Sequence, residues 1–205
     1  MMNTAKLFNL TQDALYKTQF DLLWQWFYGS GMLNDEWLIN DGLAVNAANP
    51  EQCANNHGLE WSYNQGVILG GLSAMEARDE NFFNISSRII RAVMRDLTST
   101  QGILHEQVPD DHVEQSGDAS QFKGIWMRYL MYWFLQNDDE AQNEDIKQEI
   151  VGFVKQQMTG IVANSMNPMC FAQFSAVWNA SWIDTDYAAV AQASAIDLFN
   201  WAFIL

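Results

Sequence analysis

The chain has 205 residues, of which 49% are hydrophobic and 13% are aromatic, so it can bury a large core and is not a disordered protein. Its formal net charge is −15 with only ten Lys and Arg residues. This balance argues against nucleic acid or an anionic membrane surface as a partner, because both bind clustered positive charge. The charge does not argue against neutral or cationic ligands. The start of the chain has no apolar run of signal-peptide length, and we expect a single domain over residues 1–205.

The first part of the chain predicts two helices separated by a long loop. An apolar stripe at helical spacing predicts a helix from Thr4 to Tyr28, and whether it breaks near Tyr16 stays open. A loop of about 35 residues follows, from Ser30 to Asn64, which is long enough to suggest a function. The next stretch, Gly66 to Arg78, is apolar on nearly every side, as in a helix that is buried all round.

The same alternation of a one-sided helix, a loop and an apolar helix continues to the end of the chain. One-sided helices carry charged residues on one face, and the helices after the loops are apolar almost throughout. The predicted segments are a helix over Phe82–Leu97, a loop over Thr98–Ser120, a helix over Phe122–Leu135, a helix over Glu140–Ala163, a loop over Asn164–Asp186 and a helix over Tyr187–Leu205.

This alternation predicts an all-α fold with two concentric layers of helices. Amphipathic helices would form the outer layer and apolar helices the inner one, giving an α/α toroid of about three hairpins. Internal similarity supports the repeat, because Gly31-Met32-Leu33 and Gln65-Gly66-Val67 resemble Gly102-Ile103-Leu104 and Lys123-Gly124-Ile125. An ordinary helical bundle stays open on periodicity alone.

If the hairpins repeat in the same sense, all three long loops open at one end, where the inner helices begin. Carboxylates, amides and aromatic rings gather there, which suits a sugar, since acceptors bind its hydroxyls and rings stack on its faces. For several of these residues a role in capping or packing competes with sugar binding. The candidate residues are Asp41, Trp61, Tyr63, Asn64, Gln65, Glu106, Asp118, Gln121, Phe122, Trp178, Trp182 and Asp184.

Other kinds of site have no support in the sequence. No group of His, Cys or Asp has metal-ligand spacing, and no Gly-rich phosphate loop occurs, so we expect no metal and no cofactor. Whether Cys53 and Cys170 pair cannot be read from their positions. We expect Arg128, in an apolar helix, to form a buried ion pair with a carboxylate. We expect the aromatic stripe of the same helix, including Trp126 and Trp133, to lie in the core.

Several motifs occur in an order that matches a known family. They are Asn40-Asp41-Gly42-Leu43, the segment from Trp61 to Leu72, Gly102-Ile103-Leu104-His105-Glu106, the segment from Asp118 to Arg128, and Gln192-Ala193-Ser194-Ala195-Ile196-Asp197. From about Leu22 to the C-terminus the chain resembles glycoside hydrolase family 76, the endo-α-1,6-mannanases and their fungal cell-wall relatives.

The resemblance implies an (α/α)6 toroid of six hairpins, of which this chain matches the C-terminal half. It implies action on α-1,6-mannan or on mannose-containing cell-wall glycans, with one carboxylate as nucleophile and another as acid/base in a retaining mechanism. It also implies an extracellular or cell-wall location, a mannan-type oligosaccharide or polysaccharide as the partner, and no cofactor.

The chain departs from the family at the catalytic pair. The family uses two adjacent Asp residues followed closely by Trp, upstream of every motif matched here, and no counterpart lies between Met1 and Leu22. Asp110-Asp111 is the nearest substitute, but aromatic residues do not follow it. We therefore predict no catalytic residue within this chain. A non-catalytic glycan-binding remnant and a helical scaffold without a ligand are the alternatives. Apolar inner helices of half a toroid would be exposed, which predicts self-association.

Overall fold

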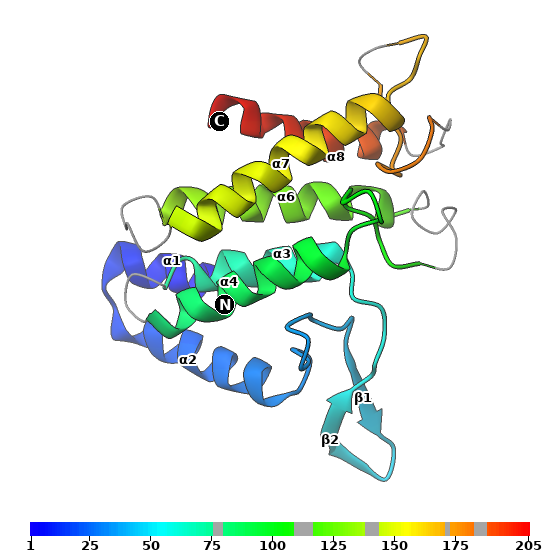
Figure 1. The fold of residues 1–205 in the computed structure, drawn as a ribbon. Coiled ribbons are helices and arrows are strands. Elements are labelled where there is room, and N and C mark those ends of the chain that lie inside the picture. The colour runs from blue at the N-terminus through cyan, green and yellow to red at the C-terminus, as the bar shows by residue number, and fades with distance from the viewer. Residues whose placement is uncertain (76–79, 109–116, 138–143, 171–172, 183–187) are drawn as a thin grey trace.

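The computed structural model describes residues 1–75, 80–108, 117–137, 144–170, 173–182 and 188–205. These ranges contain seven α-helices, a short 3-10 helix and one pair of strands (Figure 1). The prediction of an all-α toroid of helical hairpins is confirmed. The elements are α1 (Met2–Thr11), α2 (Ala14–Gly29), β1 (Leu43–Asn46), β2 (Asn49–Asn55), α3 (Ser62–Leu72), α4 (Glu80–Asp96), α6 (Ala119–Gln136), α7 (Glu144–Asn164), α8 (Ala188–Phe199) and η3 (Asn200–Phe203).

The first predicted helix is two helices. Gln12 adopts a left-handed backbone conformation with φ of 58°, which ends α1, and the side chain of Asp13 accepts a hydrogen bond from the backbone N–H of Leu15 as the N-cap of α2. The break therefore lies upstream of Tyr16. Its consequence is that α1 packs against both α2 and α3 and joins the inner layer.

The helices form two layers, as the alternation predicts. Helix α6 packs between α3 and α8, while α4 and α7 pack on the outside of α3 and α8 (Figure 1). Helix α4 shows the outer pattern most clearly, because Ile89, Ile90 and Val93 are buried and Arg88 and Arg91 are exposed. Burial of such an apolar stripe supplies most of the stability of an amphipathic helix.

Two glycines let the inner helices touch through their backbones. A Cβ atom on Gly66 of α3 would lie 3.0 Å from the Cα of Trp126 in α6, and a Cβ on Gly124 of α6 would lie 2.5 Å from the Cα of Ser194 in α8. The backbone N–H of Gly124 also donates to Ser194 Oγ at 2.8 Å. These glycines are the ones that the internal repeat places at equivalent positions, so the repeat marks the helix contacts.

The described parts of the three long connectors lie at one end of the molecule, on the right of Figure 1. This confirms the prediction that they open together at the start of the inner helices. The first connector also contains the antiparallel pair of β1 and β2, which the sequence analysis did not predict. The pair is short and mostly exposed, so it lacks the long apolar alternation by which a strand is recognised.

The core of the helical layers contains the aromatic residues expected there. Trp126 and Trp133 of α6 are fully buried, and the indole of Trp133 donates to Ser86 Oγ at 2.8 Å. Arg128 has the predicted carboxylate partner, because its guanidinium binds both oxygens of Asp197 at 2.6 and 3.1 Å. The pair is buried on one side only, since Asp197 is buried while the Arg128 side chain is 58% exposed. None of the helices in the described ranges is long and apolar enough to cross a membrane.

Candidate functional site

Three aromatic side chains meet where α3 and α6 begin. The rings of Tyr63 and Phe122 lie 4.3 Å apart between centroids, with 38° between their planes, and Trp61 meets Phe122 edge-on at 5.2 Å. All three side chains are half-buried, so each keeps an accessible surface. Such a corner offers apolar faces for the C–H surface of a pyranose ring.

Polar groups stand beside this aromatic corner. Asp41 is exposed, and its Oδ1 lies 3.5 Å from both Tyr63 Oη and Asn64 Nδ2, which are donors at the long limit of a hydrogen bond. A carboxylate held so loosely keeps acceptor capacity for a ligand hydroxyl. Burial, and next the charge of Asp41, raise the pKa of Tyr63, so its phenol is a donor at neutral pH. We call Asp41, Trp61, Tyr63, Asn64 and Phe122 the rim cluster.

Glu106 supports the rim cluster from behind. Its carboxylate accepts the backbone N–H of Ser62 at 2.9 Å and the Ser62 hydroxyl, and both residues are fully buried. The bond lies at the N-terminus of α3, where the helix dipole favours negative charge. Glu106 thus joins the second long connector to the helix that carries Trp61 and Tyr63, and its carboxylate faces the protein interior.

Gln65 also faces inward. Ile39 donates its backbone N–H to Gln65 Oε1 at 2.8 Å, and Gln65 Nε2 donates to the Ile39 carbonyl at 2.9 Å. Two other glutamines bind the other connectors in the same way: Gln157 binds Leu104 N–H and the Gly102 carbonyl, and Gln192 binds both backbone groups of Phe174. Each connector is therefore fixed by one buried or half-buried amide.

The remaining candidates from the sequence lie in different environments. Trp178 is fully buried, and the Lys123 ammonium lies 5.7 Å from the centre of its ring. Trp182 and Gln121 are half-buried, and Asp118 is exposed just before α6. Asp184 and Asp110-Asp111 lie outside the described residues. The structure therefore brings together the rim cluster and places Gln65, Glu106 and Trp178 in the protein interior.

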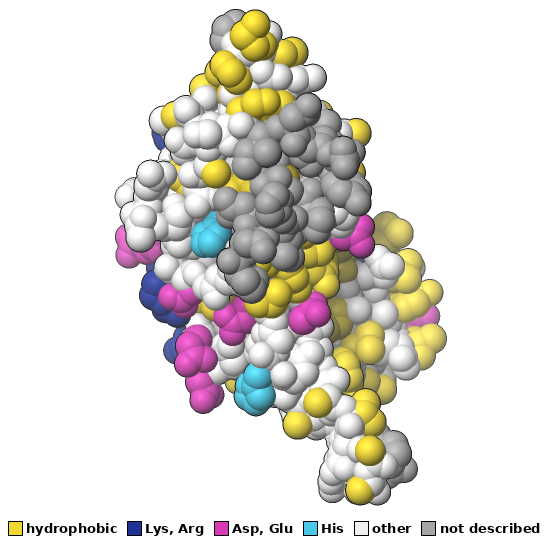
Figure 2. Space-filling view, turned by 90° about the vertical axis from the view of Figure 1, so that its right-hand side faces the viewer, with side chains coloured by type: hydrophobic (Ala, Val, Ile, Leu, Met, Phe, Trp, Pro, Cys, Tyr) yellow, Lys and Arg dark blue, Asp and Glu magenta, His cyan; other side chains and the backbone are white. Residues whose placement is uncertain are grey.

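The loop end of the molecule carries more negative than positive charge. In Figure 2, which looks onto this end, Asp and Glu side chains are spread over the surface and Lys and Arg side chains are visible only near one margin. A surface of this sign attracts cationic ligands, repels anionic ones and exerts no net force on neutral ones. In the described ranges, no group of three or more His, Cys, Asp or Glu side chains could hold a metal ion. Cys53 and Cys170 are both exposed free thiols.

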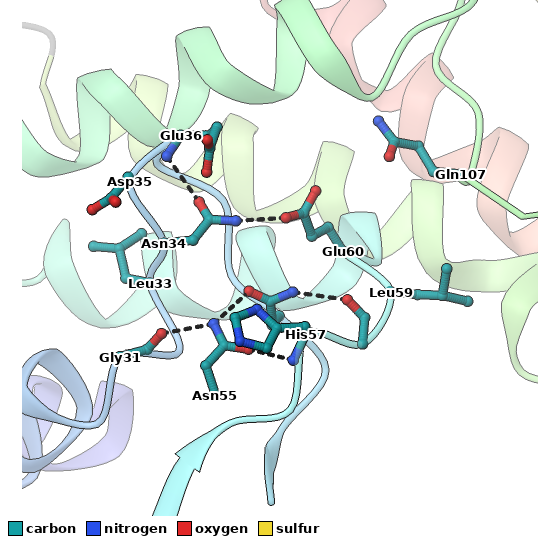
Figure 3. Close-up of a pocket in the computed structure, with 12 residues that line it drawn as sticks. Gly31, Leu33, Asn34, Asp35, Glu36, Asn55, His57, Leu59, Glu60 and Gln107 are labelled. Carbon is teal, nitrogen blue, oxygen red and sulfur yellow. Dashed lines mark hydrogen bonds between the residues drawn. The ribbon is translucent and has the colours of Figure 1, made fainter.

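A separate pocket of about 610 Å³ lies within the first connector (Figure 3). Its walls come from segments 31–40 and 55–60, with Gln107 on a further side. Three asparagines, Asn34, Asn40 and Asn55, form its frame, and Glu60 faces into it. No pattern in the sequence predicts this pocket. The available signal was the density of Asn in the connector, since Asn side chains readily bond nearby backbone groups.

Comparison with known protein families shows which family the chain resembles. The sequence pattern of Glycosyl hydrolase family 76 matches residues 2–205. The chain belongs to this family. As a family 76 protein it is 26% identical over 132 residues to the mannan endo-1,6-alpha-mannosidase DCW1 of Candida albicans, an alignment that covers 62% of this chain and 28% of that protein. It is 31% identical over 132 residues to DCW1 of Eremothecium gossypii, with the same coverage.

Solved family 76 structures share the fold. The GH76A alpha-1,6-mannanase of a Salegentibacter species superposes with a TM-score of 0.78 at 16% identity, covering 98% of this chain and 56% of that one. An inactive variant of the same enzyme, with two adjacent aspartates replaced, was solved with alpha-1,6-mannotetrose and gives a TM-score of 0.77. Dfg5 of Chaetomium thermophilum, solved with glucosamine, gives 0.75 at 17% identity, covering 98% of this chain and 49% of that one.

The chain spans little more than a quarter of the curated relatives it matches and about half of these solved chains. Its inner and outer helices therefore correspond to part of a larger family 76 toroid.

Proposed function

We propose that this family 76 chain supplies one wall of a cleft that binds α-1,6-linked mannooligosaccharides, as part of a glycoside hydrolase acting on mannan or on mannose-containing cell-wall glycans. The observation that carries the proposal is the rim cluster. It combines a half-buried aromatic corner with a loosely held carboxylate at the start of two inner helices of a family 76 fold. Such a combination binds the face of a sugar ring and its hydroxyls together.

The charge of the loop end fits this substrate class. An α-mannan chain is neutral, so it does not suffer the repulsion that the carboxylates of the loop end impose on anionic polymers. Asp41 and Asn64 supply an acceptor and a donor for hydroxyls, and Tyr63 Oη supplies a donor. By family resemblance, hydrolysis would proceed with retention, and the nucleophile and acid/base carboxylates would come from outside the motifs matched in this chain. The reaction would take place at the cell wall or outside the cell.

The second candidate is a glycan-binding protein without hydrolytic activity. It uses the same rim cluster, and it differs only in the source of the catalytic carboxylates. The two functions are separated by following binding and product release in the same sample.

The test is titration of the full chain with α-1,6-mannotriose, followed by chromatography of the sugars. We expect saturable binding that falls roughly five- to 150-fold in Tyr63→Ala and Phe122→Ala, taking a ring that stacks on a sugar to contribute about 1–3 kcal/mol, the value for aromatic side chains stacked on nucleic-acid bases. Tyr28→Ala, which removes an exposed tyrosine of α2, is the matched control and should bind normally. Release of shorter sugars would favour the hydrolase, binding alone would favour the glycan-binding protein, and no binding would refute both.

A further inference from the structure

The pocket in the first connector has the size of a binding site, although it lies outside the rim cluster. Its volume of about 610 Å³ falls within the range of small-molecule sites in proteins. We propose that it binds a second, uncharged sugar unit of the same glycan. This inference rests on the proposed function for its choice of ligand, and its test reads the pocket separately.

The pocket walls are held in place without a ligand. Asn55 Nδ2 donates to the Gly31 carbonyl at 2.8 Å and to Asn40 Oδ1 at 2.7 Å, and Asn40 Nδ2 donates to the Gly58 carbonyl at 2.8 Å. These bonds join segment 31–40 to segment 55–60 across the back of the pocket (Figure 3). A site that needs no ordering on binding loses less of its interaction energy to conformational entropy.

A second set of hydrogen bonds joins the same two segments. Asn34 Oδ1 accepts the backbone N–H groups of Glu36 and Leu38 at 3.1 and 2.8 Å, and Asn34 Nδ2 donates to Glu60 Oε1 at 2.5 Å. Glu60 is therefore positioned through one oxygen, and a carboxylate has further lone pairs on both oxygens to accept bonds from a ligand.

The groups that face the pocket favour a ligand rich in hydrogen-bond donors. Asp35, Glu36 and Glu60 present carboxylates, and Leu33 and Leu59 present apolar surface. Hydroxyls of a hexose can donate to the carboxylates while its C–H groups contact the leucines. Lys and Arg are absent from the described lining residues, where His57 is the one basic side chain against these three carboxylates, so a sugar that carries a carboxylate or a phosphate would be repelled. Arg95 lies beside the pocket and donates to the Glu36 carbonyl at 3.2 Å. The selected class is a neutral hexose.

The pocket and the rim cluster share two segments of chain. Asn40 of the pocket directly precedes Asp41 of the rim cluster, and Glu60 directly precedes Trp61. The two sites therefore adjoin along the chain at both segments, and the proposal places different sugar units of the same glycan in them. Linked binding of this kind raises the overall affinity through effective concentration.

The test is amide NMR of the uniformly 15N-labelled full chain, titrated with methyl α-D-mannopyranoside and, separately, with glucuronic acid. We expect the mannoside to move the backbone signals of Gly31 and Gly58 and the side-chain signals of Asn34 and Asn55 along one saturable curve. Glucuronic acid should leave them in place. Signals of the rim cluster, such as the Trp61 indole and the Asn64 amide, report the proposed function independently.

Two variants and one control variant assign the signals. Leu59→Trp fills the pocket and should abolish the movement of Gly31 while leaving that of Asn64, and Leu135→Trp, the same change at an exposed position of α6, should alter neither. Glu60→Gln keeps an oxygen for Asn34 and should weaken mannoside binding in the pocket roughly three- to tenfold. Unmoved pocket signals, movement that survives in Leu59→Trp, or an equal response to glucuronic acid would each overturn the inference, whatever the rim cluster does.

Discussion

The side-chain amide of Gln65 forms two hydrogen bonds with the backbone of Ile39, accepting its N–H at 2.8 Å and donating to its carbonyl at 2.9 Å. Both residues are buried, so neither bond can be replaced by water. The amide thereby fixes the first long connector against α3, directly after Tyr63 and Asn64 of the rim cluster.

Removing this amide should destabilise the protein strongly. Gln65→Ala leaves the N–H and carbonyl of Ile39 buried without partners, and each unsatisfied group costs about 1–3 kcal/mol. We expect the free energy of unfolding in urea to fall by roughly 2–5 kcal/mol. Gln148→Ala, which removes an exposed amide of α7 bonded to Glu144, is the control and should change it by less than about 0.5 kcal/mol. Equal effects of the two changes would contradict this account of Gln65.

A single methyl group on Gly124 should disturb the inner layer. The added Cβ would stand 2.5 Å from the Cα of Ser194, and a backbone atom cannot turn aside as a flexible side chain can. We expect Gly124→Ala to lower the free energy of unfolding by about 1–3 kcal/mol, the usual effect of overpacking.

Gly152→Ala in α7 should instead raise the free energy of unfolding. An added Cβ there would meet nothing within 4 Å, and the higher helix propensity of Ala contributes about 0.5–1 kcal/mol. Thermal unfolding of the two variants beside the unaltered chain measures both signs. A stable Gly124→Ala protein would show that the inner helices can separate.

Glu60 should make stability depend on pH. Burial chiefly raises the pKa of Glu60, and the charges of Glu36 and Asp96 raise it further, against the lowering effect of the bond from Asn34. A carboxyl with a raised pKa in the folded state favours folding when protonated, so its contribution is present below the ordinary pKa and is lost as the pH rises through the raised value.

Glu60→Gln should therefore raise the melting temperature at pH 7 and change it least at low pH. The accompanying gain in the free energy of unfolding should stay below about 1 kcal/mol, because Glu60 is only half-buried and water screens its charge. Asp35→Asn removes the same charge from an exposed neighbour and controls for the net charge of the protein. A gain that is equal for both variants, or equal at every pH, would remove burial of Glu60 as the cause.

Exposed apolar side chains at the end of the inner layer should cause self-association of the chain. Ile196 of α8 is 59% exposed and Phe203 of η3 is 90% exposed. We expect sedimentation velocity to show species larger than the monomer at micromolar concentration, and the double change Ile196→Asn with Phe203→Ser to reduce them. Val162→Asn, at an exposed position of the outer helix α7, should leave the distribution as it was. A monomer at every concentration would oppose this prediction.

The helical layers could be predicted from the sequence because their signals are local. The stripe of Ile89, Ile90 and Val93 has a 3.6-residue period, and the echoed Gly66 and Gly124 mark equivalent contacts. The break at Gln12 could not be predicted, because a left-handed residue other than Gly has a weak sequence signal.

The candidate site was harder to predict, since it depends on side-chain direction at the helix starts. Tyr63 and Gln65 are two residues apart in the same helix, yet Tyr63 faces Phe122 at the rim and Gln65 faces Ile39 inside. A sequence without coordinates cannot separate an amide that binds a ligand from one that binds its own backbone. The pocket framed by Asn34, Asn40 and Asn55 depends on contacts across up to 26 residues of an irregular connector, which no periodicity describes.

The close approach at Gly66 and Gly124 has a consequence for how such proteins can change over time. At these two contacts the backbones of neighbouring inner helices touch, because each glycine carries only a hydrogen atom in place of a side chain. The spacing of these helices therefore does not depend on the size of a side chain. Substitutions elsewhere can change the side chains on the surface that the inner helices support, but the distance between these helices stays constant. New ligand preferences would therefore arise from the connectors, which can lengthen or exchange residues while the ring beneath them keeps its dimensions.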